Sequence, residues 1–360
     1  MKFLPDVISF SLGLILVLVL SAAPLSHALV VDALYDQEIP VQGQGDAERL
    51  RAYREALTAV ILKITGEERW LRNGAVERAV REAQNYVQEV SYRSSGGASS
   101  QTYISIRFDQ ELVNSMLGSA GIPVWDRNRP SVLLWLSVQS ADGQRELLGS
   151  DSDHPILALI REFSQVRGVP ILIPLLDVED RRSLPADVAW SLDEAAIRRA
   201  SARYGADSVL SGRVLTSPVG DLVGLWQFLF RDRVEIFDSL ESDLAAYMQS
   251  ALNRVTAQLA THFAINLATR PAQEQVTLRV EGVDNITAYV NLLAYIRDLA
   301  VVENVSTSLL DGSNIELDVT LVGSTYLFTE FITLGRDLIP GELTNPQEVQ
   351  GNILHYRWVR

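Results

Sequence analysis

Apolar positions divide the chain into three modules, and the first, about residues 29–128, mixes helices with strands. Spacings of three and four residues between apolar positions predict two amphipathic helices, and Gly66 ends the first of them. A Ser/Gly-rich segment at 94–100 predicts the turn of a hairpin. This pattern indicates an α+β domain. The predicted elements are a strand at 30–34, helices at 46–63 and 74–90, a hairpin made by Tyr92 and 103–108, and a helix at 111–117.

Continuous apolar runs alternate with helices in the second module, about residues 130–270. Such runs are typical of parallel strands buried on both faces, so the module is predicted to be a Rossmann-like three-layer α/β domain. An antiparallel hairpin follows at 222–230 and 234–239, and Ser242 is predicted to cap a helix that ends near residue 263. The earlier elements are strands at 132–138, 170–176 and 208–214, with helices at 154–166 and 192–204.

The third module, about residues 271–340, predicts a βαββα sandwich with its helices on one face of the sheet. A tail, residues 341–360, completes the chain. Within it, apolar and polar residues alternate over 353–359, which predicts a short terminal strand carrying Tyr356 and Trp358. This strand either docks back as an edge strand or pairs with a partner protein. The fold class is therefore α/β and α+β in three modules.

The first 28 residues have the composition of a secretory signal peptide. Lys2 precedes an apolar run at 7–20, and the small residues Ser26 and Ala28 occupy the positions that determine cleavage. We expect cleavage after Ala28 and a periplasmic location in a bacterium. The alternative is an inner-membrane protein anchored by the uncleaved leader, although the apolar run is shorter than the ~20 residues that span a bilayer. After cleavage we expect no membrane span.

Composition excludes several kinds of chemistry. The chain has no cysteine, which removes lipoprotein anchoring, thiolate catalysis and cysteine-bound metals. Its net charge of −14 argues against nucleic acid as a partner. After the leader Lys63 is the only lysine, and His154, His262 and His355 lie far apart without zinc-site spacing. We therefore expect no cofactor and no metal.

Three carboxylates follow the second predicted strand of the middle module: Asp177, Glu179 and Asp180. Ligands of open α/β sheets bind beyond the carboxyl ends of the strands, so a ligand site is expected here. Clustered carboxylates can bind a metal or perform acid–base catalysis, because their mutual repulsion raises one pKa. The alternative is a solvated turn with Arg181 and Arg182 nearby.

A second group of candidate contacts lies in the phrase Arg203-Tyr204-Gly205-Ala206-Asp207, between a helix and a buried strand. Gly205 ends the helix and Asp207 leads into the strand, so a structural role explains the phrase. A binding role for Arg203, Tyr204 or Asp207 is the alternative, and Tyr356 and Trp358 are the corresponding candidates in the tail.

Several phrases resemble a family of exported proteobacterial proteins, the domain of unknown function 2066 family. They are Arg54-Glu-Ala-Leu57, Lys63-Ile-Thr-Gly66, Pro123-Val-Trp125 with Arg129-Pro130, the run 174–180, and the run 200–207. The resemblance covers nearly the whole chain after the leader. It implies a fold and an exported location, and no functional residue.

The middle module is more distantly similar to the amino-terminal domain of the Tol-system translocation protein and to the curli secretion lipoprotein. In both, a helix runs into a strand that begins with Gly-Ala-Asp, which is Gly205-Ala206-Asp207 here. The similarity implies an α/β module used for protein assembly in the cell envelope. This chain lacks the lipidated cysteine of the curli protein.

These observations predict a non-catalytic binding or assembly factor of the bacterial cell envelope, whose partner is an envelope protein. One alternative is an envelope hydrolase of glycan or peptide that uses Asp177, Glu179 or Asp180. Another is a sensor that binds a small ligand at the strand ends of the middle module.

Overall fold

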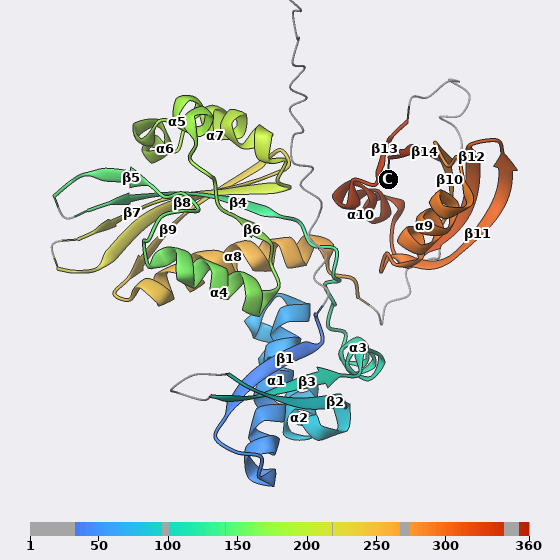
Figure 1. Cartoon of the computed structure of the whole chain (residues 1–360), viewed down its shortest axis with the longest axis horizontal. Helices are drawn as coiled ribbons and strands as arrows, with labels where there is room; N and C mark the ends of the chain where they lie inside the picture. The colour runs from blue at the N-terminus through green and yellow to red at the C-terminus, as the bar shows by residue number, and fades with distance from the viewer. Residues whose placement is uncertain are drawn as a thin grey trace, which may run out of the picture.

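The computed structural model describes residues 33–95, 101–140, 142–217, 219–266, 274–341 and 353–359, and these form three β-sheets with helices packed on them (Figure 1). The mixed α/β architecture agrees with the sequence prediction. The predicted leader lies outside the described residues, as do residues 30–32 of the first predicted strand. Residues 33–35 form a turn instead of a strand.

The first module is a three-stranded antiparallel sheet in the order β1-β3-β2, packed against helix α1. The second predicted helix was wrong in length, because it ends at Arg81 and residues 87–94 form a strand. Val90 and Tyr92 pair there with Ile106 and Ile104 of β3, so sheet pairing overrides the helical spacing. The elements are β1 Asp36–Val41, α1 Asp46–Thr65, α2 Gly74–Arg81, β2 Val87–Ser94, β3 Thr102–Phe108 and α3 Gln110–Ser119.

The middle module is a mixed sheet in the order β5-β4-β7-β8-β9, with β6 on β4. Figure 1 shows α5, α6 and α7 on one face of the sheet and α4 and α8 on the other, which gives the predicted three layers. The elements are β4 Val132–Gln139, β5 Arg145–Leu147, α4 Ile156–Arg167, β6 Ile171–Leu172, α5 Val178–Ser183, α6 Ala186–Ser191, α7 Glu194–Ser201, β7 Ser208–Thr216, β8 Leu222–Phe230, β9 Arg233–Glu241 and α8 Leu244–Phe263.

Three boundaries of the middle module differ from the prediction. Strand β6 has two residues instead of seven, because Pro170 and Pro174 flank it and proline has no N–H for the β-ladder. The helix predicted to start at Leu192 starts at Glu194, and Leu192 instead ends α6 with a positive φ of 57°. Asp243, not Ser242, caps α8.

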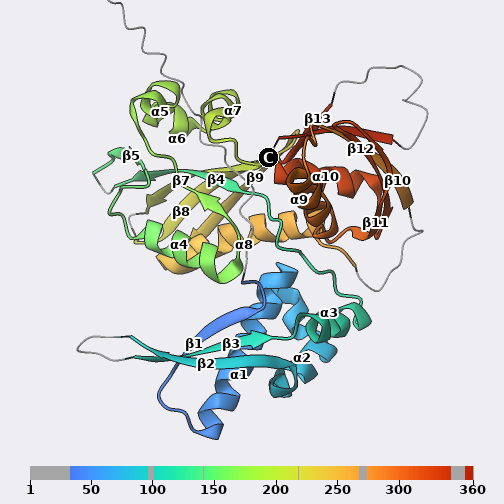
Figure 2. The same cartoon turned by 45° about the vertical axis from the view of Figure 1, so that its right-hand side comes forward.

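The third module has a five-stranded sheet in the order β11-β12-β10-β14-β13. Figure 2 shows α9 and α10 on the same side of this sheet, as predicted. The terminal strand β14 pairs in parallel with β10 and antiparallel with β13, so it is an interior strand and the edge-strand prediction was wrong. The elements are β10 Glu274–Glu281, α9 Ile286–Arg297, β11 Val302–Asp311, β12 Asn314–Leu321, α10 Thr325–Gly335, β13 Leu338–Pro340 and β14 Ile353–Trp358.

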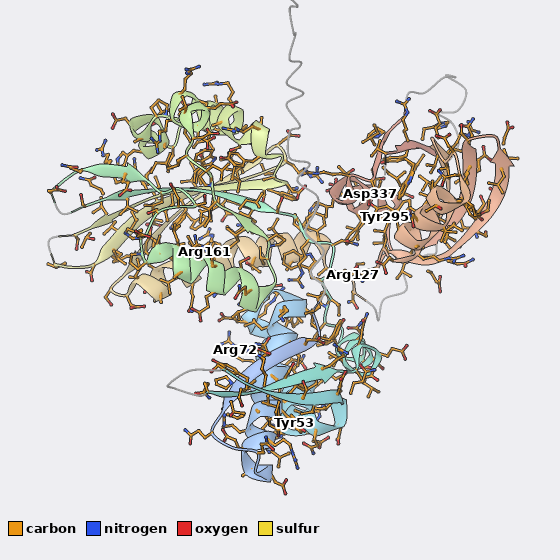
Figure 3. All side chains as sticks on the ribbon, in the orientation of Figure 1. Tyr53, Arg72, Arg127, Arg161, Tyr295 and Asp337 are labelled. Atoms are coloured by element: carbon orange, nitrogen blue, oxygen red, sulfur yellow. The ribbon has the colours of Figure 1, made fainter. Side chains whose placement is uncertain are left out.

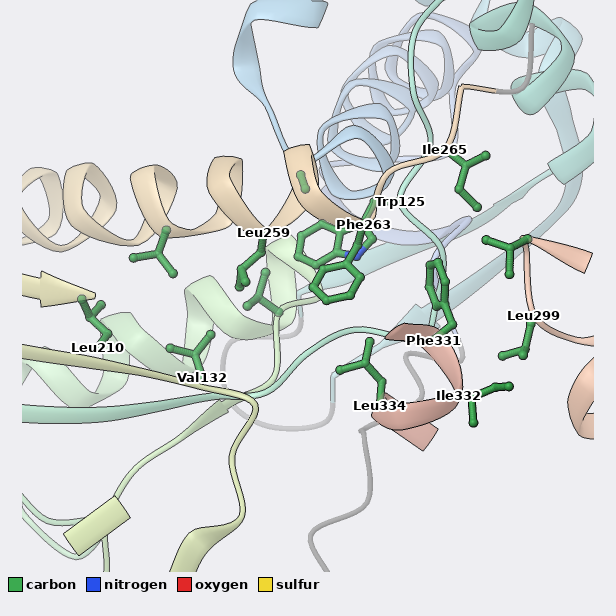
Figure 4. Close-up of a cluster of buried hydrophobic side chains, with 14 of the residues drawn as sticks. Trp125, Val132, Leu210, Leu259, Phe263, Ile265, Leu299, Phe331, Ile332 and Leu334 are labelled. Atoms are coloured by element: carbon green, nitrogen blue, oxygen red, sulfur yellow. The ribbon is translucent and has the colours of Figure 1, made fainter. Parts of the chain in front are cut away.

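One hydrophobic core continues from the middle module into the third (Figure 4). Phe263 at the end of α8 packs edge-on against Phe331 of α10, with ring centroids 5.9 Å apart. Trp125, from the segment that links the first two modules, is fully buried in the same core. The first module has its own core around α1. The middle and third modules therefore pack as one body.

Among the described residues, no helix is both long enough and apolar enough to cross a membrane.

Candidate functional site

The predicted carboxylates lie at the start of α5, after the short strand β6. Asp177 is the N-cap of α5, and its carboxylate accepts a hydrogen bond from the backbone N–H of Asp180 at 2.9 Å. The side chain of Asp180 is fully buried, whereas Glu179 is 70% exposed. The helix cap therefore turns Asp177 and Asp180 toward the same neighbour and leaves Glu179 in solvent.

That neighbour is the turn after α7, which brings Arg203 and Tyr204 to the carboxylates. The Arg203 guanidinium binds both oxygens of Asp177, at 2.7 and 2.8 Å, and lies 3.0 Å from Asp180 Oδ1. The Tyr204 hydroxyl donates to Asp180 Oδ2 at 2.5 Å. Glu179 lies 3.6 Å from Arg203. We name Asp177, Asp180, Arg203 and Tyr204 the carboxylate–arginine cluster.

Both carboxylates of the carboxylate–arginine cluster have all their oxygens hydrogen-bonded. Asp180 Oδ2 also accepts the backbone N–H of Leu176 at 2.9 Å, and the Tyr204 hydroxyl accepts that of Leu175 at 2.9 Å. The hydrogen bond from Arg203 holds the pKa of Asp177 well below its usual range. Burial raises the pKa of Tyr204, and its hydrogen bond to Asp180 raises it further. A general acid needs the opposite shift at the carboxylate.

The carboxylate–arginine cluster rests on the central sheet. The Tyr204 ring meets the ring of Trp135 edge-on, with centroids 6.0 Å apart, and Trp135 is buried in β4. The Trp135 indole N–H donates to the Ser201 hydroxyl of α7 at 2.9 Å. These contacts fasten the layer of α5 and α7 to the sheet. The geometry is that of a structural contact that holds α5 and α7 on the central sheet.

Asp207 lies apart from the carboxylate–arginine cluster, at the start of β7. Its Oδ2 accepts from the backbone N–H and the hydroxyl of Ser131, at 2.7 and 2.8 Å. Its Oδ1 lies 3.3 Å from the guanidinium of Arg336, which follows α10 and also donates to the Gly205 carbonyl. Asp207 therefore joins two strands of the middle module to the third module.

Tyr356 and Trp358 do not present a surface to a partner. Both side chains are 5% exposed, because β14 is an interior strand and these two positions point into the core of the third module. The Trp358 ring packs on that of Tyr295 of α9, with centroids 6.0 Å apart. Figure 3 shows Tyr295 and Asp337 inside the same module.

Sequence reasoning missed a fully buried cation at the junction of the first two modules. The Arg129 guanidinium lies over the Trp125 ring, 4.3 Å from its centroid, and among the described residues no carboxylate forms an ion pair with it. It donates instead to five backbone carbonyl oxygens, those of Lys63 (2.8 Å), Arg167 (2.9 Å), Asp126 (3.0 Å), Trp125 (3.2 Å) and Gly168 (3.2 Å).

Arg129 fits this position because two helices end beside it. Helix α1 ends at Gly66 and α4 ends at Gly168, and the C-terminal carbonyl groups of helices carry partial negative charge. Arg167 adds a bond across the same junction, from its guanidinium to the Gly66 carbonyl at 2.8 Å. Burial lowers the pKa of Arg129 to about 9, so it remains charged at neutral pH. The signal in the sequence is Arg129 directly before Pro130, together with Gly66 and Gly168, which mark the ends of the two helices that Arg129 contacts.

Gly66 shows how closely this junction is packed. Its φ is +72°, which favours glycine, and a Cβ there would collide with the Cβ of Ala260 in α8. The C-terminal end of α1 therefore packs directly against α8. Nearby, Arg127 forms an ion pair with Asp298 after α9, where the three modules meet (Figure 3).

The side chain of Lys63 gives a pH-dependent test of packing within the first module. Its ammonium group donates to the carbonyl oxygens of Ala33 and Asp36 at 3.2 and 3.1 Å, and burial lowers its pKa to about 8. The unfolded chain therefore holds this proton to higher pH than the folded chain, so Lys63 makes the free energy of unfolding rise from about pH 8 to pH 10. Between about pH 8 and pH 10, the free energy of unfolding of the wild type should rise by about 3 kcal/mol relative to that of Lys63→Met. Urea denaturation at several pH values measures the difference, and a constant difference would contradict the burial of Lys63.

Of the cavities in the described part of the chain, two lie beside residues discussed above. One of about 450 Å³, beside α5 and α6, is lined by residues that include Arg145, Asp151, Leu176 and Arg181. Another of about 430 Å³ lies between the first and third modules and includes Asp126. In the part of the chain that the structure describes, no His, Asp and Glu side chains gather as a metal site would require.

A family model described as a domain of unknown function (DUF8605) matches residues 28–126. The match covers the first module and ends next to the buried junction. It agrees with an uncharacterised family, but it supports neither the 2066 family nor the similarity to the Tol and curli proteins. None of the curated proteins matches the chain.

Proposed function

We propose that this protein is a non-catalytic binding or assembly factor of the bacterial cell envelope, exported by its leader and cleaved after Ala28. The main support is the carboxylate–arginine cluster, where the best candidates for catalysis in the sequence form a closed set of bonds. Every carboxylate oxygen of Asp177 and Asp180 accepts a hydrogen bond from a group of the same module. Binding through surfaces needs no free acid or base.

The arrangement of the modules also favours binding. The middle and third modules share one core, and the first module is fastened to the middle one by Arg129 and Arg167. Surfaces on all three modules are therefore held in a fixed relation, as a scaffold for a partner requires. The family match begins at residue 28, next to the predicted cleavage site.

An activity assay tests the non-catalytic assignment against the hydrolase alternative. Purified protein is incubated with cell-wall glycan and with peptides, next to the variants Asp177→Asn and Glu179→Gln. We expect no turnover above the buffer blank in any of the three. Glu179→Gln tests the neighbouring carboxylate that remains exposed to solvent. Wild-type turnover that either variant abolishes would overturn the proposal.

A small-ligand sensor remains the second candidate, and the cavity beside α5 favours it. Its lining includes Arg145 and Arg181 as well as Glu146 and Asp151, and it shares Leu176 with the loop that the carboxylate–arginine cluster holds. A ligand bound there would stabilise the folded chain. A thermal-shift screen with anionic envelope metabolites tests this candidate, and the absence of any shift would reject it.

A further inference from the structure

Strand β9 is the most open sheet edge that the structure describes. It has nine residues and pairs with β8 without a register shift. Proteins usually protect edges by shortness, bulges or proline. The other described edges follow this rule: β5 and β13 have three residues each, β11 and β2 have register shifts, and β1 contains Pro40. Strand β9 has none of these three protections, although it carries charged side chains, which also protect edges, at Arg233, Glu235, Asp238 and Glu241.

The free backbone groups of β9 belong to its even-numbered residues. The bond from Ser217 N–H to the Asp221 carbonyl shows that odd-numbered residues of β8 bond to β7, so even-numbered residues of β8 bond to β9. Their partners in β9 are odd-numbered, from Arg233 to Glu241. The N–H and C=O groups of positions 234, 236, 238 and 240 therefore point away from the sheet.

The side chains at the same even positions form an exposed apolar surface. Ile236 and Leu240 are 61% and 65% exposed, and Val234 is also exposed. Leu240 lies beside Val223 of β8, which lies beside Leu215 of β7, and both are exposed. Helices α5 to α7 lie on this side of the sheet (Figure 1), and α6 and α7 contact β4, β5 and β7 there. Helix α8 covers the opposite face of β9.

We propose that a second copy of this chain pairs antiparallel with β9, about a two-fold axis at Phe237. The charges of the strand select this register. Arg233 of each copy lies opposite Glu241 of the other, and Val234 lies opposite Leu240. Opposite charges and apolar pairs stabilise neighbouring strands. Within the described part of the chain, neither Arg233 nor Glu241 forms an ion pair.

The neighbouring registers are less favourable. A shift of two positions one way places Asp238 opposite Asp238 and Glu235 opposite Glu241, and like charges directly opposite destabilise a pair. The shift the other way places Glu235 opposite Phe237 and separates Arg233 from Glu241. It also sets Val234 opposite Asp238, just as the register centred on Phe237 sets Ile236 opposite Asp238. In every register the pairing must join even-numbered to even-numbered residues, because only these have free backbone groups. The register centred on Phe237 meets this condition and also forms both Arg233–Glu241 ion pairs.

Charge exchange tests the pairing directly. Sedimentation equilibrium of the purified protein should show a dimer that dissociates on dilution. Arg233→Glu or Glu241→Arg alone should weaken dimerisation about tenfold, because each creates two like-charge pairs, and the double variant should restore it to within about threefold. Arg161→Glu, on the exposed side of α4, is the control and should leave dimerisation unchanged.

Cross-linking tests the register. The chain has no cysteine, so Val234→Cys and Leu240→Cys introduce the only thiols. A short thiol-specific cross-linker should join the two variants when they are mixed, because these positions lie ~5.5 Å apart between Cα atoms in a hydrogen-bonded pair. Neither variant alone should cross-link, since position 234 of one copy lies about six residues, or ~20 Å, along the strand from position 234 of the other copy.

Asp238→Asn should tighten the dimer, because the two Asp238 carboxylates lie diagonally across the two-fold axis. A protein that stays monomeric up to high concentration would overturn the proposal, as would a dimer that ignores the charge exchange. A monomer that instead binds an extended peptide of another protein at β9 would also overturn it. The proposal goes beyond the envelope function and holds or fails independently of it.

Discussion

Replacing Arg129 by methionine is expected to lower the free energy of unfolding by about 4 kcal/mol, the largest effect of any single substitution at the module junction. Methionine keeps much of the apolar volume over Trp125 but removes the hydrogen bonds that Arg129 donates to five backbone carbonyl groups. The ends of α1 and α4 would also lose the cation that their partial charges attract. Urea denaturation followed by tryptophan fluorescence measures the loss.

The matched control is Arg161→Met, since Arg161 lies on the exposed side of α4 with one bond, to the Ser150 carbonyl. It should change the free energy of unfolding by less than about 0.5 kcal/mol. If Arg129→Met had an equally small effect, the first module would be attached by other contacts. The proposal that the three modules form one scaffold would then lose its main support.

Removing residues 353–360 is expected to unfold the third module, because β14 lies between β10 and β13. Trp358→Ala gives the point-mutation equivalent and should cost about 3–5 kcal/mol, as for other buried tryptophans. Loss of the Trp358 ring leaves a cavity beside Tyr295. Limited proteolysis should then cut the third module while the first remains intact.

Arg357→Gln is the control for the terminal strand, because Arg357 is the exposed residue between Tyr356 and Trp358. It should leave the proteolysis pattern unchanged. A truncated chain that keeps a folded third module would contradict the interior position of β14. The same truncation cannot test partner binding, since any loss of binding would follow from unfolding.

Local patterns in the sequence predicted most of the elements. The helix that ends at Gly66, the hairpin of β8 and β9, and the βαββα order of the third module all follow from apolar spacing and turn residues. The errors occur where tertiary pairing decides. Val87 to Val90 continues a helical spacing, yet it becomes β2 because β3 offers a partner, and two prolines reduce β6 to two residues.

Contacts between distant segments were beyond the sequence. Asp177 and Arg203 are 26 positions apart, and nothing local indicates that one binds both oxygens of the other. Arg129 reaches Lys63 and Arg167, which precede and follow it by 66 and 38 positions. The sequence analysis named the four members of the carboxylate–arginine cluster as candidate contacts of a ligand or partner. Only the fold shows that they bind each other.

Cross-linking in intact cells, followed by mass spectrometry of the captured complexes, tests the central claim most directly. Amine-reactive reagents are unsuitable, because the only lysine after the leader is the buried Lys63. A photo-activatable residue at exposed positions in each module, Leu112, Val178 and Ile286, avoids this problem. The predicted result is a processed chain that begins at Leu29, joined to a specific envelope protein. An unprocessed chain that carries its leader and is joined to cytosolic proteins would contradict it.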